Sequence, residues 1–218
     1  MKQLFSGVFS DGKNLYTKNL LVGNKVYGEK LVQGDGVEYR QWDYHRSKYA
    51  AGLKNGLKES IFESGSKVLY LGSAEGTTVS HVSDIVGEKG TIFGVDISEI
   101  AMMKLMVLAE KRQNILPIVA DAQNVKDYEE FLEEKVDALF QDISQRNQAE
   151  IFVRNAQFLK VGGLGALSLK TKSISQANKK EDILADEKKI LSSVFEIIQV
   201  VSLEPFEKHH YLILVRKK

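Results

Sequence analysis

The chain has 218 residues, 43% of them hydrophobic, and a formal net charge of +1. This length suits one globular domain of ordinary size with a small appendage. The absence of cysteine excludes disulfides, thiolate metal sites and a cysteine nucleophile, and four histidines leave little for a zinc site. No apolar run reaches the roughly 18 residues of a membrane helix, and the N-terminus lacks the apolar stretch of a signal peptide. We therefore expect a cytoplasmic protein with no membrane partner.

The charge is unevenly distributed along the chain, because its positive excess lies within residues 1–60. Such an excess fits a nucleic-acid surface, and it fits an ordinary solvated surface equally well. A chain with net charge near zero is poorly equipped to hold RNA alone by neutralising phosphates. If its ligand is RNA, we expect it to work with partners.

Residues 1–58 predict a small β-rich domain with a linking helix. Turn-forming segments interrupt strand-like runs at the short spacing of hairpins, namely Asp11-Gly12, Gly23-Asn24 and Gly34-Asp35-Gly36. Residues 44–63 predict a helix, because apolar side chains recur about four positions apart along one face: Tyr49, Leu53, Leu57 and Ile61. Between the last of these turns and the predicted helix, Tyr39, Arg40 and Trp42 fit an RNA-facing surface, although Trp42 equally fits a core between domains.

Residues 59–218 predict a second domain in which strands alternate with helices. Strand-like runs lie at 68–72, 91–96, 115–121, 136–142 and 165–170. Helical patterns lie at 77–86, 99–112, 128–132, 146–159 and 183–195. Because parallel neighbours need a crossover connection, this alternation predicts an α/β fold with a doubly wound, mostly parallel sheet. The last two strands, 196–206 and 209–217, have no helix between them and predict a hairpin, so that the sheet ends with one antiparallel strand.

The residues that end the predicted strands are the first candidates for a site, since ligands of such sheets bind at the carboxyl ends of the strands. These residues are Gly72, Asp96, Asp121, Asp142 and Lys170. Any one of them also fits a helix cap or a loop charge, but four charged residues at successive strand ends favour a ligand site.

The loop GSAEG, residues 72–76, narrows the class of ligand. Gly72 allows close backbone approach, Gly76 allows a tight turn, and Thr77 or Thr78 can cap the next helix. Dinucleotide-binding loops usually read GxGxxG and bring backbone amides to a pyrophosphate. Here the middle glycine is missing, and Glu75 would place a negative charge where a diphosphate lies. This disfavours a nicotinamide dehydrogenase.

An adenosine ligand that has positive charge and no phosphate fits this loop better, and S-adenosyl-L-methionine has these properties. Asp96 follows the glycines at the usual spacing for an acid that accepts hydrogen bonds from ribose hydroxyls. Asp121 would lie near the adenine amino group. Acids after the second, third and fourth strands, together with the closing hairpin, indicate a class I methyltransferase.

Four parts of the sequence form distinctive blocks: YRQWDYHRSKYAAGL (39–53), VLYLGSAEGTTVSHVSDIVG (68–87), DISQ (142–145) with VRNAQFLKVGG (153–163), and LEPFEKHHYLILV (203–215). Together they closely resemble the fibrillarin family in its archaeal form, over essentially the whole chain. The resemblance implies a Rossmann-like, S-adenosylmethionine-dependent methyltransferase with a seven-stranded, mostly parallel sheet that contains one antiparallel strand. The small N-terminal β-domain precedes it.

The glycine loop and this resemblance together give the predicted cofactor contacts: Gly72, Ser73, Ala74, Gly76, Thr77, Thr78, Asp96, Ile97, Asp121, Ala122, Asp142, Ile143, Ser144 and Gln145. No metal ligand is predicted. The chain departs from the family at Glu75, Asp96 and Ser144, where serine, glutamate and alanine are usual. Of the three, Glu75 leaves the contacts of the methionine end open.

The resemblance also implies a catalytic set formed by Lys48, Asp142, Lys170 and His210. We predict that Lys170, beside Asp142, orients the acceptor hydroxyl and helps to deprotonate it, while Lys48 and His210 steer the target. The residues alone leave other interpretations open. Lys48 on an amphipathic helix also fits a surface lysine, and His210 at a strand start also fits simple packing.

The activity that the resemblance implies is 2'-O-methylation of ribose in rRNA and tRNA, directed by a box C/D guide RNA. The implied partners are a Nop-type scaffold protein and a kink-turn-binding ribosomal-type protein. Two alternatives remain: a small-molecule O-methyltransferase that uses the same cofactor, and a non-catalytic structural subunit of a ribonucleoprotein.

Overall fold

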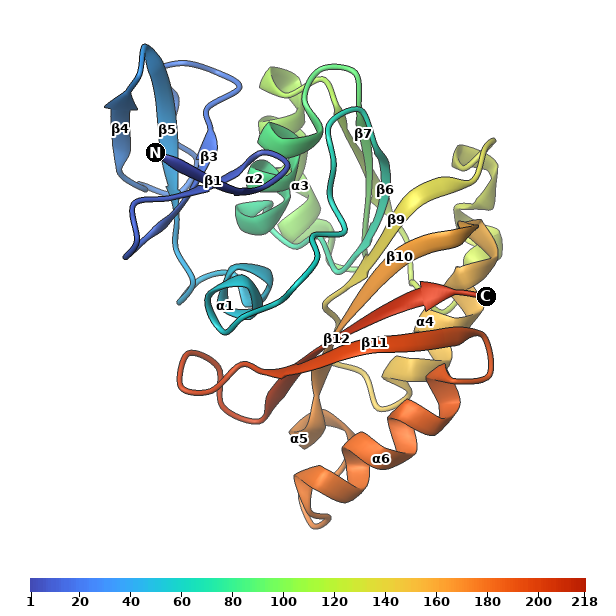
Figure 1. Ribbon diagram of the computed structural model, residues 1–218. Helices are drawn as coiled ribbons and strands as arrows, with labels where there is room; N and C mark the ends of the chain where they lie inside the picture. Colours follow the sequence, from blue (N-terminus) through green and yellow to red (C-terminus); the bar gives the residue numbers. More distant parts are fainter.

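Two β-sheets form the protein, and the computed structural model describes residues 1–218 (Figure 1). The first sheet is antiparallel, with the order β1-β2-β3-β5-β4. Its strands are β1 (Lys2–Phe5), β2 (Val8–Ser10), β3 (Leu15–Lys18), β4 (Leu31–Gly34) and β5 (Val37–Trp42).

Two of the three predicted turns join neighbouring strands of this sheet. The Asp11 carboxylate accepts hydrogen bonds from the backbone N–H groups of Lys13 and Asn14, at 2.8 and 2.6 Å, and so turns the chain between β2 and β3. Gly34-Asp35-Gly36 joins β4 to β5. Gly23-Asn24 lies instead in the long connection between β3 and β4, so the hairpin predicted there is wrong.

The second sheet has seven strands in the order β11-β12-β10-β9-β6-β7-β8. They are β6 (Lys67–Leu71), β7 (Thr91–Asp96), β8 (Ile115–Val119), β9 (Val136–Gln141), β10 (Leu159–Lys170), β11 (Phe195–Ser202) and β12 (His210–Lys217). β12 pairs antiparallel with both β10 and β11, and it is the one strand that runs opposite to the other six. The predicted seven-stranded sheet is confirmed. Its antiparallel strand is not at the edge as predicted but second from it, because β11 is the edge strand and β12 lies between β11 and β10.

The helix predicted at 77–86 is confirmed, and the other predicted helices are shorter than the sequence pattern indicates. The helices are α1 (Lys48–Lys54), α2 (Thr77–Val86), α3 (Glu99–Lys111), α4 (Gln148–Asn155), α5 (Thr171–Ile174) and α6 (Lys180–Leu191). The helix predicted at 44–63 begins only at Lys48, after its N-cap Ser47, and ends at Lys54 with Asn55 as its C-cap, because Gly56 has a left-handed backbone with φ +93°. The helix predicted at 128–132 is a pair of 3-10 turns, Val125–Asp127 and Glu129–Phe131. No helix combines the length and apolar character needed to cross a membrane.

Both faces of the seven-stranded sheet are covered, as the alternation of strands and helices predicts. Successive residues of β6 point to opposite faces: Tyr70 belongs to the core shared with α2, α3 and the N-terminal segment, and Leu71 to the core shared with α4 and α6. Figure 1 shows the N-terminal sheet beside α2 and α3, with α4 and α6 on the other side. Because both faces are covered, the ends of the strands are the part of the sheet that a ligand can reach.

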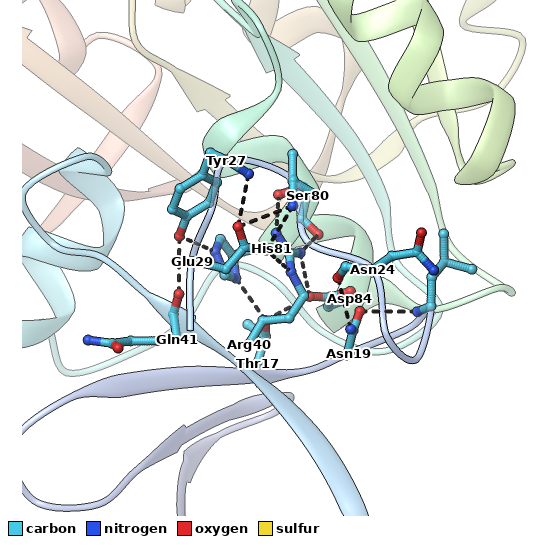
Figure 2. Close-up of polar contacts among 12 residues, drawn as sticks. Thr17, Asn19, Asn24, Tyr27, Glu29, Arg40, Gln41, Ser80, His81 and Asp84 are labelled. Carbon is cyan, nitrogen blue, oxygen red and sulfur yellow. Dashed lines mark hydrogen bonds and ion pairs between the residues drawn. The ribbon is translucent and has the colours of Figure 1, made fainter. Parts of the chain in front are cut away.

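A buried polar cluster connects the N-terminal sheet to α2 (Figure 2). Arg40 on β5 donates to Glu29 at 2.6 Å and to Asp84 on α2 at 2.8 Å. Arg112 donates to the second oxygen of Asp84 at 2.7 Å. His81 hydrogen-bonds through both ring nitrogens, one to Thr17 at 2.8 Å and the other to Tyr27 at 2.7 Å. Burial and the two arginines hold the pKa of His81 well below its usual value.

This cluster corrects one interpretation of the sequence. Tyr39, Arg40 and Trp42 are all buried, so they do not form an RNA-facing surface. Trp42 stacks on His81 with ring centroids 5.0 Å apart, and it belongs to the core between the N-terminal sheet and the seven-stranded sheet. The second interpretation of Trp42, as core, is the correct one.

Candidate active site

The loop from β6 to α2 begins the site, and its two glycines have separate steric roles. Gly72 has φ +83°, and a Cβ built on it would lie 2.3 Å from the carbonyl oxygen of Asp142. Gly76 has φ +90° and is the N-cap of α2. Neither threonine caps α2, because the cap has no side-chain hydrogen bond. Thr78 donates instead to Ser47, the N-cap of α1, at 3.1 Å.

A hollow of about 260 Å³ opens at the carboxyl ends of β6, β7, β8 and β9, which we call the cofactor hollow. Nine of the fourteen predicted cofactor residues line it: Gly72, Asp96, Ile97, Asp121, Ala122, Asp142, Ile143, Ser144 and Gln145. Val95 and Ala120 line it as well. Sequence reasoning missed these two because it considered charged strand ends and gave no weight to small apolar ones.

Three carboxylates, at the ends of three strands, make the cofactor hollow acidic. Asp96 accepts a hydrogen bond from the backbone N–H of Ala74 at 2.8 Å, and Asp121 accepts one from the N–H of Gln123 at 2.9 Å. Asp142 continues β9 directly. Carboxylates with remaining acceptor capacity suit ribose hydroxyls, an amino group or a cation, and they disfavour a diphosphate.

The other five predicted cofactor residues belong to the loop and the helix start, outside the lining of this hollow. Ser73 is buried and donates to the sulfur of Met102 at 3.6 Å. Thr77 lines a different hollow, between α2, α3 and the connection from β3 to β4. Ala74, Gly76 and Thr78 shape the loop and join it to α1. Their predicted contact with a cofactor stays a prediction.

Glu75 does not occupy the place that the sequence suggests. Its exposed carboxylate pairs with Lys104 on α3, and it does not line the cofactor hollow. Glu75 lies next to Gly76, the N-cap of α2, so its effect on a diphosphate at that helix N-terminus stays a prediction. The three strand-end carboxylates disfavour a diphosphate independently of Glu75.

An ion pair lies beside the cofactor hollow. Nζ of Lys48, the first residue of α1, donates to Asp142 at 2.8 Å, and both side chains are partly exposed. Ser47 fixes the start of α1 by accepting a hydrogen bond from the N–H of Ala50 at 3.3 Å. Lys48 is thus positioned at the site and is not a free surface lysine.

Lys170 and His210 form the second pair of predicted catalytic residues. They lie directly opposite each other on the antiparallel strands β10 and β12, where facing side chains emerge on the same side of the sheet. The Nδ1 of His210 lies 2.9 Å from the carbonyl oxygen of Lys208. Because a carbonyl oxygen only accepts, Nδ1 carries the proton and Nε2 is the free acceptor of the neutral ring.

The protonation of His210 follows from its surroundings. Burial lowers its pKa below the usual value, and the nearby positive charge of Lys48 lowers it further, whereas Glu207 and Asp142 act in the opposite direction. The imidazole is therefore neutral near pH 7. No three or more histidine, aspartate or glutamate side chains converge at distances that would hold a metal ion.

Comparison with known proteins identifies the family. The family model described as Fibrillarin matches residues 1–218. The chain belongs to the fibrillarin family. The resemblance stated from the sequence is confirmed, and with it the class I methyltransferase fold.

Relatives of the fibrillarin family match along the whole chain. The fibrillarin-like rRNA/tRNA 2'-O-methyltransferase of Thermococcus sibiricus is 46% identical over 222 residues, which cover 99% of this chain and 98% of the relative. Fibrillarin of Aeropyrum pernix, solved with natively bound S-adenosyl-L-methionine, has a TM-score of 0.88 and 41% identity, over 97% of this chain and 94% of that chain. A solved fibrillarin/Nop5p complex matches with a TM-score of 0.89 and 36% identity, covering both chains fully.

One further residue of this fibrillarin site was missed by sequence reasoning. Gln148, the first residue of α4, is completely buried. Its side chain accepts a hydrogen bond from the N–H of Lys170 at 2.9 Å and donates to the carbonyl oxygens of Lys170 and Gln145, at 3.1 and 2.8 Å. It therefore fastens the end of β10 to the loop after β9. No sequence signal marks it, because it ends no strand and carries no charge.

Proposed function

We propose that this protein methylates the 2'-hydroxyl of ribose in rRNA and tRNA, with S-adenosyl-L-methionine as the methyl donor, as the catalytic subunit of a ribonucleoprotein in the cytoplasm. One observation carries the proposal. A chain that matches the fibrillarin family from end to end has an acidic hollow at its strand ends, and the Lys48–Asp142 and Lys170–His210 pairs flank that hollow.

The lining of the cofactor hollow fits S-adenosylmethionine group by group. Asp96 would accept hydrogen bonds from the ribose hydroxyls, and Asp121 would accept one from the adenine amino group. Ile97 and Ala122 would enclose the adenine ring with apolar atoms. Asp142 would face the positively charged end of the ligand. When bound, this cofactor supplies a methyl group that its sulfonium has already activated for attack by the hydroxyl oxygen.

The residues of this chain would contribute mainly by positioning. Aligned reactants at near-attack distance gain roughly 7 to 11 kcal/mol over free encounter. Lys170 would donate a hydrogen bond to the target hydroxyl and hold it. The neutral Nε2 of His210, on the facing strand, would accept the hydroxyl proton directly or through Lys170. Lys48, bound to Asp142, would keep that carboxylate in place.

Partners follow from the charge balance and from the family. With 30 basic and 29 acidic side chains, the protein has little net attraction for an RNA backbone. A box C/D guide RNA would select the target by base pairing, a Nop-type scaffold would hold the methyltransferase, and a kink-turn-binding ribosomal-type protein would anchor the RNA. The solved fibrillarin/Nop5p complex supports the scaffold.

Transfer of a labelled methyl group tests the proposal. The protein is assembled with guide RNA and the two partner proteins, and two targets are compared: a normal RNA and one that lacks a single 2'-hydroxyl at the predicted site. We expect label in the normal target alone. Label in both would place the reaction at another atom. Label in neither, from an intact assembly that binds the cofactor, would refute the proposal in favour of a scaffold or small-molecule role.

A further inference from the structure

A second hollow, larger than the cofactor hollow, adjoins it. It measures about 700 Å³, and Ser144 and Gln145 line both spaces. None of its nine lining residues is hydrophobic. A space of this size without apolar walls does not suit a base or a drug-sized molecule, since such ligands bind in mostly apolar pockets. We call it the polar hollow.

The charge of the polar hollow is opposite to that of its neighbour. Arg146, Lys170 and Lys172 line it, and no aspartate or glutamate does. None of these three cations makes an ion pair with a carboxylate. Three cations around one space that no carboxylate lines form an arrangement that suits an anion.

The three cations come from neighbouring backbone segments, two of which a buried amide connects. Arg146 lies in the loop between β9 and α4, Lys170 ends β10, and Lys172 lies two residues further, in α5. The buried amide of Gln148 hydrogen-bonds to the backbone of both Gln145 and Lys170. It therefore connects the loop that carries Arg146 to the strand end that carries Lys170.

We propose that the polar hollow is a phosphate subsite for the target RNA strand, in which Arg146 and Lys172 bind backbone phosphate next to the methylated ribose. This inference rests on the proposed function. A ribose whose 2'-hydroxyl lies at Lys170 has its 3'-phosphate on the neighbouring carbon, and Lys170 lines the polar hollow together with Arg146 and Lys172. Phosphate contacts fix register without reading sequence, which suits a target that is chosen by base pairing.

The experiment uses the complete ribonucleoprotein and two independent perturbations. One is the double variant Arg146→Gln/Lys172→Gln, and the other is a target whose phosphate 3' of the methylated nucleotide is an uncharged methylphosphonate. The matched control is Lys188→Gln/Lys189→Gln. These are exposed, unpaired lysines near the C-terminus of α6, which leads to the start of β11, at the sheet end opposite Lys170.

The expected result is a loss of target binding without a loss of chemistry. The double variant should raise the target concentration for half-maximal rate about 10-fold and lower the slope of log affinity against log salt by about 1 per contact removed. The saturating rate should change less than about 2-fold, because the reacting groups are intact. The methylphosphonate should weaken binding to the wild type by a similar factor and have little further effect on the double variant.

Two outcomes overturn the inference in distinguishable ways. If wild-type assembly methylates its target but neither perturbation weakens binding more than the control does, the polar hollow binds no target phosphate, and the proposed function still stands. If wild-type assembly transfers no methyl group at all, the proposed function fails and the inference falls with it. The methylphosphonate result in the wild type decides the question even if the double variant is unstable.

Discussion

Two ion pairs join the N-terminal part of the chain to the methyltransferase sheet, and they differ in access to solvent. The N···O distance is 2.8 Å in each. The side chains of Arg40 and Asp84 are completely buried, whereas those of Lys48 and Asp142 remain 27% and 22% exposed. Pair distance alone therefore does not separate the buried pair from the pair at the candidate site.

The number of partners separates the two pairs. The guanidinium of Arg40 donates to Glu29, to Asp84 and to two oxygens of Ser80. Lys48 donates one hydrogen bond of the three that an ammonium can form. Buried charges need complete sets of partners, because their desolvation is expensive. Partly exposed charges with free capacity can bind a substrate.

The largest expected effect is on the reaction itself, through Lys170→Met. This change keeps the aliphatic part of the side chain and removes the ammonium that would hold the hydroxyl. We expect the single-turnover rate of methyl transfer to fall about 10²- to 10⁴-fold, as for loss of a positioned proton-transfer group. Cofactor affinity and the unfolding midpoint should stay unchanged, as should the rate of Lys188→Met. A rate within about 10-fold of wild type would remove Lys170 from the chemistry.

Next in size is the stability of the buried cluster, which Arg40→Met breaks. Glu29 loses its positive partner and Asp84 one of its two, so the free energy of unfolding should fall by about 3 to 5 kcal/mol. Urea denaturation measures this. Lys104→Met, which breaks the exposed pair with Glu75, should change it by less than about 1 kcal/mol. Equal losses for the two variants would show that burial does not distinguish them.

Lys48→Met gives the corresponding test at the open pair. The free energy of unfolding should change by less than about 1 kcal/mol, because the pair is partly exposed. The single-turnover rate should nevertheless fall about 10- to 100-fold, as Asp142 loses the group that orients it. If stability falls and the rate does not, the pair is structural and the contrast with Arg40 disappears.

The smallest effects concern pH, where two buried groups act in opposite directions. The pKa of His81 lies well below its usual 6.5, so the unfolded state binds more protons below that pH, and this group makes stability fall on acidification. Burial, the largest cause, raises the pKa of Glu187 to about 7, with Glu150 and Asp186 contributing, although the N–H of Ala149 opposes the shift. The stability that Glu187 contributes is present below its unfolded value of 4.5 and is lost as pH rises through 7.

Unfolding at pH 5, 6 and 7 separates the two groups. His81→Gln should remove a positive slope of stability with pH, and Glu187→Gln a negative one, each by up to about 1.4 kcal/mol per pH unit. Glu187→Gln should also stabilise the protein at pH 8, because the amide is buried without a charge. If both variants shift the slope in the same direction, one of these assignments is wrong.

The sequence predicts the seven-stranded sheet and the edge where its ligand would bind, because both follow from patterns within short segments of the chain. Alternation of strands and helices requires crossovers, and the strand ends Asp96, Asp121 and Asp142 then meet at one edge whatever the details of packing. The same rule places Lys170 there. The sequence does not predict that β12 pairs with β10 and that β11 forms the edge of the sheet. The apolar pattern of the hairpin is the same whichever of the two strands lies at the edge.

The remaining features depend on partners distant in sequence. In the sequence Arg40 resembles a surface charge, because its partner Asp84 lies 44 residues away along the chain. Glu75 appears in the loop sequence to face a ligand, but its partner is Lys104 on the next helix. Gln148 gains its role only from contacts with Lys170. The apolar periodicity also continues past Gly56, although the helix has ended before it. Leu57 and Ile61 keep the pattern because they are buried, but they are not helical.

The absence of a side chain at Gly72 has a consequence for distance. β6 and β9 are adjacent, and the N–H of Asp142 bonds to the carbonyl oxygen of Leu71 at 2.9 Å. A single methyl group at Gly72 would meet the backbone of Asp142 and force the two strand ends apart. One strand end begins the loop that leads to α2, and the other carries Asp142, which lines the cofactor hollow with Gly72. The hydrogen atom on the α-carbon of Gly72 therefore sets how closely the two strand ends approach each other at that hollow.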